Sequence, residues 1–115
     1  MKKIYMQKII LLKGLPASGK TTWALQKCLE DSEFKRINKD DIRASMPVQK
    51  WSKDFESTVL HKERLLGIDF IQRGYNLIVD DTNFNSKHEN FWKDIALKYN
   101  CDFEIMFFDT SVKEC

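Results

Sequence analysis

A glycine-rich segment near the start of the chain has the residue types and spacing of a phosphate-binding loop. It reads Gly14-Leu15-Pro16-Ala17-Ser18-Gly19-Lys20-Thr21. Gly14 and Gly19 permit a tight turn and a close approach of backbone N–H groups to phosphate oxygens. Lys20 can reach the β and γ phosphates, and Thr21 offers a hydroxyl to Mg²⁺. The loop therefore predicts ATP binding, although by itself it does not separate kinases from GTPases or motor ATPases.

Two acidic pairs could supply the carboxylate that a phosphoryl transferase needs beside the γ-phosphate. Asp40-Asp41 follows one short apolar run, and Asp80-Asp81 ends another. Groups at the carboxyl ends of strands in a doubly wound sheet meet at the edge where a phosphate loop lies. We therefore expect both pairs to converge on the glycine-rich loop.

Asp40 and Arg43 are three residues apart at a predicted helix start, so they share one face of that helix. Asp40 could take the proton of an acceptor hydroxyl while Arg43 binds a neighbouring phosphate. The alternative is a helix-capping carboxylate in an ordinary ion pair, with no chemical role. The glycine-rich loop favours the first interpretation, because a carboxylate beside a phosphate site can act as the base toward an acceptor hydroxyl.

The segment Asp80-Asp81-Thr82-Asn83 also has two interpretations. An apolar strand that ends in Asp matches the carboxylate that holds Mg²⁺ or its waters in P-loop proteins. The same residue types also stabilise ordinary turns. Adjacent strand residues point to opposite sides, so only one of Asp80 and Asp81 should face the site, and the sequence does not decide which.

The candidate residues lie between segments with the patterns of alternating strands and helices. Apolar runs predict strands over residues 9–12, 34–38, 76–80 and 103–108. Amphipathic patterns predict helices over residues 21–30, from 40 onward, over 54–73 and over 87–99, the last capped by Ser86. This alternation predicts an α/β fold of the P-loop NTPase type, with a parallel sheet of about four strands and helices on both faces.

Length and composition set broad limits. The 115 residues allow one domain, and a formal net charge of +2 neither demands nor excludes a nucleic acid partner. Three widely spaced cysteines, the absence of an export pattern and the absence of a long apolar run predict a cytoplasmic protein with no membrane partner. We expect His61 and His88 to be solvated or locally bonded rather than catalytic.

Three ordered blocks, residues 14–24, 37–43 and 80–85, resemble the bacteriophage-type polynucleotide 5′-kinases. The resemblance spans essentially the whole chain, and the second and third blocks are the more specific ones. It implies that Lys20 and Thr21 bind ATP and Mg²⁺ and that Asp40 is the general base toward a 5′ hydroxyl. It also implies that Arg43 grips a substrate phosphate and that Asp81 orients Arg43 and the acceptor. The expected ATP-binding residues are Gly14, Pro16, Ala17, Ser18, Gly19, Lys20, Thr21 and Thr22.

The chain departs from the family pattern in two ways. That pattern continues into an arginine-bearing lid over the phosphates, whereas no arginine follows Arg73 here. The pattern Ser111-Val112-Lys113-Glu114 is that of a capping box, which predicts that a further helix begins four residues before the last residue. We therefore expect residues 1–115 to be a single P-loop kinase domain that ends before the lid, and we leave open a further domain or oligomer partner. The second departure is Asp80, where a small polar residue is more usual.

The predicted activity is transfer of the ATP γ-phosphate to the 5′ hydroxyl of RNA or DNA ends, in nucleic acid repair. The alternatives are a P-loop kinase of a small metabolite and an ATP-binding module without catalysis. Arg43 beside Asp40 favours an acceptor that itself carries phosphate.

Overall fold

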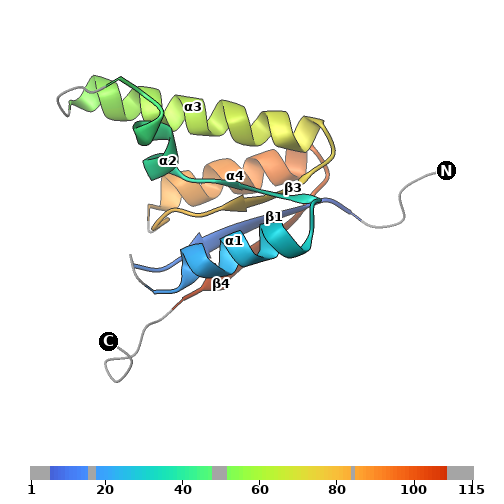
Figure 1. Cartoon of the computed structure of the whole chain (residues 1–115). Helices are drawn as coiled ribbons and strands as arrows, with labels where there is room; N and C mark the ends of the chain where they lie inside the picture. Colours follow the sequence, from blue (N-terminus) through green and yellow to red (C-terminus); the bar gives the residue numbers. More distant parts are fainter. Residues whose placement is uncertain (1–5, 16–17, 48–51, 84, 109–115) are drawn as a thin grey trace.

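The computed structural model describes residues 6–15, 18–47, 52–83 and 85–108. Pro16, Ala17 and the predicted capping box at 111–114 therefore lie outside the described residues. The elements follow one another in the order β1, α1, β2, α2, α3, β3, α4, β4 (Figure 1). The strands are β1 (Lys8–Lys13), β2 (Phe34–Ile37), β3 (Asn76–Val79) and β4 (Asp102–Phe107). The helices are α1 (Lys20–Glu30), α2 (Lys39–Ala44), α3 (Lys53–Gln72) and α4 (Ser86–Lys98).

The strands form one parallel sheet in the order β2-β3-β1-β4. β1 lies between β3 and β4, and all of its central residues, from Ile9 to Leu12, are buried. A strand covered on both faces needs a continuous apolar run rather than alternation, and β1 has one. The predicted parallel sheet of about four strands is confirmed.

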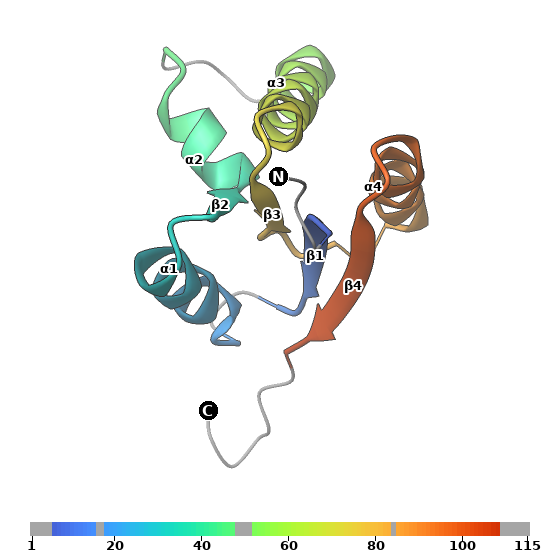
Figure 2. The same cartoon turned by 90° about the vertical axis from the view of Figure 1, so that its right-hand side faces the viewer.

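Helices cover both faces of this sheet. α1 packs Ala24 against the face that carries Ile10 and Ile78. α3 and α4 cover the opposite face, where Ile71 and Trp92 join a larger apolar cluster. Figure 2 shows α1 on one side of the strands and α3 and α4 on the other. None of the helices in the described part of the chain combines the length and the apolar character needed to cross a bilayer.

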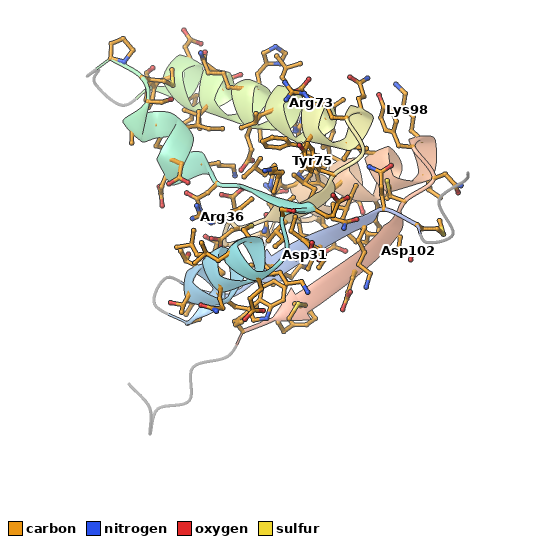
Figure 3. All side chains as sticks on the ribbon, turned by 45° about the vertical axis from the view of Figure 1, so that its right-hand side comes forward. Asp31, Arg36, Arg73, Tyr75, Lys98 and Asp102 are labelled. Carbon is orange, nitrogen blue, oxygen red and sulfur yellow. The ribbon has the colours of Figure 1, made fainter. Side chains whose placement is uncertain are left out.

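The two ends of the sheet differ in what they carry. In Figure 3 the labels Asp31, Tyr75 and Asp102 mark the chain where it reaches the amino ends of β2, β3 and β4. Because the strands are parallel, the segments that follow them all emerge at the other end. The glycine-rich loop and both acidic pairs belong to those segments, as predicted from the sequence.

Two helices begin differently from the prediction. Asn38, expected as the last residue of a strand, caps α2 by accepting a hydrogen bond from the backbone N–H of Asp41 at 3.1 Å. α4 begins at Ser86 rather than after it, because the Asn85 side chain accepts a hydrogen bond from the Lys87 N–H at 2.8 Å. Asn caps a helix as well as Ser does, so each asparagine takes the position before its helix.

Candidate active site

A pocket of about 400 Å³ opens at the carboxyl ends of the strands. Its lining comes from the end of the glycine-rich loop, the start of α2, the segment after β3 and the start of α4. The predicted site residues that line it are Lys20, Thr21, Asp40, Arg43 and Asp81. The three sequence blocks therefore converge on one pocket.

The glycine-rich loop leads directly into α1. Gly19 precedes the helix with a φ of 96°, a left-handed conformation that glycine adopts without steric cost. Within the described ranges no side chain caps α1, so none of their side-chain oxygens occupies the N–H groups at its first turn. Uncapped N–H groups at a helix start attract anions. The local structure therefore fits the predicted phosphate site, for which Gly14, Ser18 and Thr22 are also described and Pro16 and Ala17 are not.

Asp80 and Asp81 point to different surroundings. Asp80 is fully buried, with one carboxylate oxygen 3.5 Å from Lys20 Nζ and the other accepting a hydrogen bond from Arg36 Nε at 2.7 Å. Asp81 lines the pocket, and its Oδ1 accepts a hydrogen bond from the Lys39 backbone N–H at 2.9 Å. The question left open by the sequence is thus answered. Asp81 faces the pocket, and Asp80 lies against the phosphate-loop lysine.

The predicted pairing of Asp40 and Arg43 is present in α2. Arg43 Nη1 donates a hydrogen bond of 2.6 Å to Asp40 Oδ1. Arg43 also donates from Nε and Nη2 to the two carboxylate oxygens of Glu56, at 3.0 and 2.6 Å. These bonds with Glu56 raise the pKa of Arg43 further above its usual value, because they outweigh the effect of partial burial.

Glu56, in the first turn of α3, is the second carboxylate that Arg43 contacts. Among the described residues, the hydrogen bonds of Arg43 go to Asp40 and Glu56 and none goes to Asp81. A direct hydrogen bond between Asp81 and Arg43 is thus not among those of the described residues, and the role implied for Asp81 stays a prediction. The sequence offered little sign of the contact with Glu56, because Glu56 is separated from Arg43 by a connection whose path the sequence does not fix.

Asn38 and Asn83 tie the segments around the pocket together. The Asn38 side chain donates a hydrogen bond to the Asp80 carbonyl, which fixes the start of α2 to the end of β3. The Asn83 side chain donates to the carbonyls of Leu12 and Val79, at 2.6 and 3.2 Å. These bonds join the segment after β3 to β1, the strand that leads into the glycine-rich loop, so the loop and Asp81 share one frame.

His88 is buried, so of the two settings expected for it, solvated or locally bonded, the solvated one does not apply. It is 5% exposed, and its Nε2 lies 3.5 Å from Asp81 Oδ2 and 3.7 Å from Oε1 of the fully buried Glu63. The helical spacing in the sequence does indicate that Glu63 is buried, because it lies four residues after Val59 and four before Gly67 on the buried face of α3. His61, which lies in α3 two residues before Glu63, is exposed as expected.

Burial and neighbouring groups shift the pKa values of Glu63 and Asp81, the two carboxyl groups beside His88, in opposite directions. Burial and the neighbouring Asp81 raise the pKa of Glu63 to about 10. Burial acts in the same direction on Asp81, but polar contacts with His88, Glu63 and the Lys39 N–H outweigh it and lower the pKa of Asp81 to about 2. Asp81 is therefore the ionised member of the pair.

Comparisons with known proteins agree with this architecture. A family model described as an AAA domain matches residues 9–115. An L-seryl-tRNA(Sec) kinase of Methanococcus maripaludis is 33% identical over 87 residues, which are 71% of this chain and 33% of that protein. A protein of Autographa californica nuclear polyhedrosis virus, named as a bifunctional polynucleotide kinase/RNA ligase, is 25% identical over 93% of this chain and 17% of its own length.

A solved structure, that of a Pnkp1/Rnl/Hen1 complex, contains a chain of the same fold. The TM-score is 0.82 at 24% identity, over 98% of this chain and 39% of that one. The chain thus spans about a third or less of the length of the curated relatives it matches. The family match covers all of the pocket segments, from β1 through the start of α4. The chain belongs to the AAA domain family, as a P-loop domain of the kinase type.

Proposed function

We propose that the pocket transfers the γ-phosphate of ATP to the 5′ hydroxyl of a polynucleotide. The observation that carries this proposal is the joint lining of the pocket by Lys20 and Thr21 with Asp40 and Arg43. The first two residues belong to a phosphate-binding loop, and the second two offer a carboxylate and a guanidinium beside it. An acceptor that carries its own phosphate would use all four groups.

Each of these side chains has a task in the proposed transfer. Lys20 binds the β and γ phosphates through its ammonium group. Asp40 is 86% exposed at its side chain, so its carboxylate is open to an incoming hydroxyl. As the acceptor oxygen attacks the γ-phosphorus, its proton passes to Asp40 and the bond to the β-phosphate oxygen breaks, which releases ADP. Arg43 holds the phosphate on the 3′ side of the acceptor nucleoside through N–H groups that remain beside those bound to Glu56 and Asp40.

Thr21 fits the role of magnesium ligand, because a hydroxyl oxygen is a donor type that Mg²⁺ prefers and because Thr21 lines the pocket next to Lys20. When bound with ATP, Mg²⁺ neutralises charge on the β and γ phosphates. Asp80 suits this role less well, since its carboxylate lies between two cationic side chains.

The named relatives support a nucleic acid acceptor. The viral relative is named for a polynucleotide kinase and an RNA ligase, and the similar chain of known structure comes from a complex that contains Pnkp1. Repair of nucleic acid ends in the cytoplasm is the setting we propose, where thiols such as those of Cys28 and Cys101 stay reduced.

A second candidate acceptor is a hydroxyl carried by an aminoacyl-tRNA. The observation in its favour is the relative of higher identity, which is named L-seryl-tRNA(Sec) kinase. The same groups would serve, with Asp40 toward the seryl hydroxyl and Arg43 on a phosphate of the RNA.

Labelled ATP separates these candidates. The whole protein is incubated with γ-labelled ATP and one of four acceptors, namely a 5′-hydroxyl oligonucleotide, the same oligonucleotide with a 5′ phosphate, seryl-tRNA, or nucleosides and sugars. The proposal expects transfer to the first acceptor and none to the second. Transfer to seryl-tRNA alone supports the second candidate, and transfer to small molecules alone indicates a metabolite kinase. ATP binding without transfer to any of them indicates a binding module.

Substitution of the proposed base ties the activity to the pocket. Asp40→Asn should lower the rate of transfer by about 10²- to 10⁴-fold with little change in ATP affinity. The matched control is Asp94→Asn, which removes a carboxylate from an exposed position of α4. If Asp40→Asn retained the full rate, another group would have to take the proton.

A further inference from the structure

Three side chains with metal-binding groups meet beside the pocket, each from a different element. Glu63 comes from the middle of α3, Asp81 from the segment after β3 and His88 from the first turns of α4. One donor atom from each lies within 4.8 Å of the other two. All three side chains are more than nine-tenths buried, with Glu63 fully so. Because these polar side chains are buried away from water, each needs a partner inside the protein.

The distances from His88 to the two carboxylates are longer than those of ordinary hydrogen bonds. His88 Nε2 lies 3.5 Å from Asp81 Oδ2 and 3.7 Å from Glu63 Oε1. A hydrogen bond between such groups has a length of about 2.7 to 3.2 Å. Two ligands of one tetrahedral metal ion, each bound at about 2.0 to 2.2 Å, are separated by roughly 3.3 to 3.6 Å. The observed separations are closer to those of shared metal ligands.

The same atoms lack other partners. Among the described residues, no hydrogen bond reaches either carboxylate oxygen of Glu63, Oδ2 of Asp81 or either ring nitrogen of His88. Buried polar atoms without partners are costly, and two carboxyl groups close together in a buried place need either a proton or a cation between them. A single ion bound to one atom of each residue would satisfy these groups.

We propose that Glu63, Asp81 and His88 bind one divalent transition-metal ion, of which Zn²⁺ is the best fit. An imidazole nitrogen with two carboxylates suits Zn²⁺ or Mn²⁺, whereas Mg²⁺ and Ca²⁺ prefer oxygen ligands alone. Asp81 and His88 also line the pocket, so the fourth position of the ion faces it and takes a water molecule. The ion ties α3 and α4 to the end of β3 and fixes the carboxylate of Asp81. This site is separate from the magnesium that would accompany ATP at Thr21.

Metal binding is measured without nucleotide, so that the phosphate-loop site contributes nothing. The whole protein is stripped with a chelator and titrated with Zn²⁺ by calorimetry, and separately with Co²⁺, whose visible absorption is intense only in tetrahedral surroundings. We expect one ion per chain, a tetrahedral Co²⁺ spectrum and no displacement by millimolar Mg²⁺. The proposal is overturned if the chelator-stripped protein binds less than about a tenth of a Zn²⁺ ion per chain, or if the Co²⁺ spectrum is octahedral. Either result leaves a shared proton as the occupant of the cluster.

Variants locate the ion. His88→Gln and Glu63→Gln should each weaken Zn²⁺ binding by more than about 100-fold, since each removes one of three protein ligands. The control is His61→Ala, which removes an exposed histidine from the same helix as Glu63 and should leave binding unchanged. Circular dichroism verifies that each variant is folded. If His88→Gln does not fold, Glu63→Gln still tests the site. Equal binding by wild type and a folded ligand variant, or loss of binding in His61→Ala, places the ion elsewhere and refutes the assignment.

Discussion

Arg43 of α2 donates hydrogen bonds to both carboxylate oxygens of Glu56, in the first turn of α3. A bidentate pair fixes the plane of a guanidinium group as well as its position. Arg43 is thereby held at the pocket wall before any substrate phosphate arrives. Preorganisation of this kind lowers the entropy that substrate binding would otherwise lose.

Glu56→Gln tests whether that pairing prepares Arg43 for the acceptor. The amide keeps the shape of the side chain but retains only one acceptor oxygen, so Arg43 loses one hydrogen bond and its fixed plane. We expect the KM for a 5′-hydroxyl oligonucleotide to rise about tenfold, and the KM for ATP to change by less than twofold. Steady-state kinetics with each substrate varied in turn measures the difference.

Asp54→Asn is the matched control for Glu56→Gln. It removes another carboxylate from the first turn of α3, and Asp54 is exposed. The loss of favourable interaction with the helix dipole is then common to both variants. An equal rise in acceptor KM for both would mean that Glu56 acts through the helix rather than through Arg43.

Much of the fold could be predicted from the sequence because local patterns determine it. The apolar run of β1, the glycine before α1 and the four-residue spacing in α3 each report the element that contains them. Helix starts were less predictable, since Asn38 and Asn85 compete with their neighbours for the capping position.

Contacts between distant elements were not predictable in the same way. Arg36 and Asp80 meet because β2 and β3 are neighbours, with Ile37 opposite Val79. Neither strand order nor register is encoded in the local pattern of β2. The sequence therefore predicted that Lys20, Asp40, Arg43 and Asp81 would gather at one edge. It did not reveal the pairing of Arg43 with Glu56, and for Glu63 the helical spacing indicates burial but not its neighbours Asp81 and His88.

Asp80→Asn should destabilise the fold. The fully buried carboxylate lies between Arg36 and Lys20, whose side chains are 13% and 9% exposed. Removing its charge takes the shared partner from the buried Lys20 and the partly buried Arg36, although Arg36 keeps its ion pair with Asp41, so we expect a cost of about 1 to 3 kcal/mol in the free energy of unfolding. Urea denaturation measures it. Asp94→Asn, at an exposed position of α4, should change the same free energy by less than about 0.5 kcal/mol. Equal stability of the two variants would contradict a stabilising role for Asp80.

Gly67→Ala should also destabilise the protein, although alanine favours helices by about 1 kcal/mol over glycine. A Cβ atom at residue 67 would lie 2.5 Å from Cη2 of Trp92 and 3.0 Å from Cδ1 of Ile37. Trp92 of α4 is fully buried and its ring is rigid, so relief requires α3 to move away from α4 and β2. Overpacking of this kind costs about 1 to 3 kcal/mol.

Ser57→Ala is the control for Gly67→Ala. Ser57 is an exposed residue of the same helix, so its substitution reports helix propensity alone and should stabilise slightly. Thermal unfolding of both variants gives the comparison. If Gly67→Ala were the more stable of the two, close packing of α3 on Trp92 would not be limiting.

Stability at acid pH should report the ion pair between Glu89 of α4 and Lys13 of β1. The contact with Lys13 lowers the pKa of Glu89 below its ordinary value of 4.5, so the pair contributes stability above that pH and loses it as the pH falls through the lowered value. At pH 7, Glu89→Gln should lower the free energy of unfolding by about 0.5 to 1 kcal/mol.

The difference between wild type and Glu89→Gln should shrink as the pH falls through the lowered pKa of Glu89, because protonation then removes the charge from the wild-type carboxylate as well. Glu104→Gln provides the comparison, since Glu104 pairs with Lys8 at 3.6 Å and both side chains are about half exposed. Its effect should be near zero at every pH. Urea unfolding at pH 7 and pH 3.5 measures all three proteins. A Glu89→Gln effect that persisted undiminished at pH 3.5 would arise from lost packing around the side chain, and the charge of Glu89 would then contribute nothing to joining α4 to the strand that leads into the glycine-rich loop.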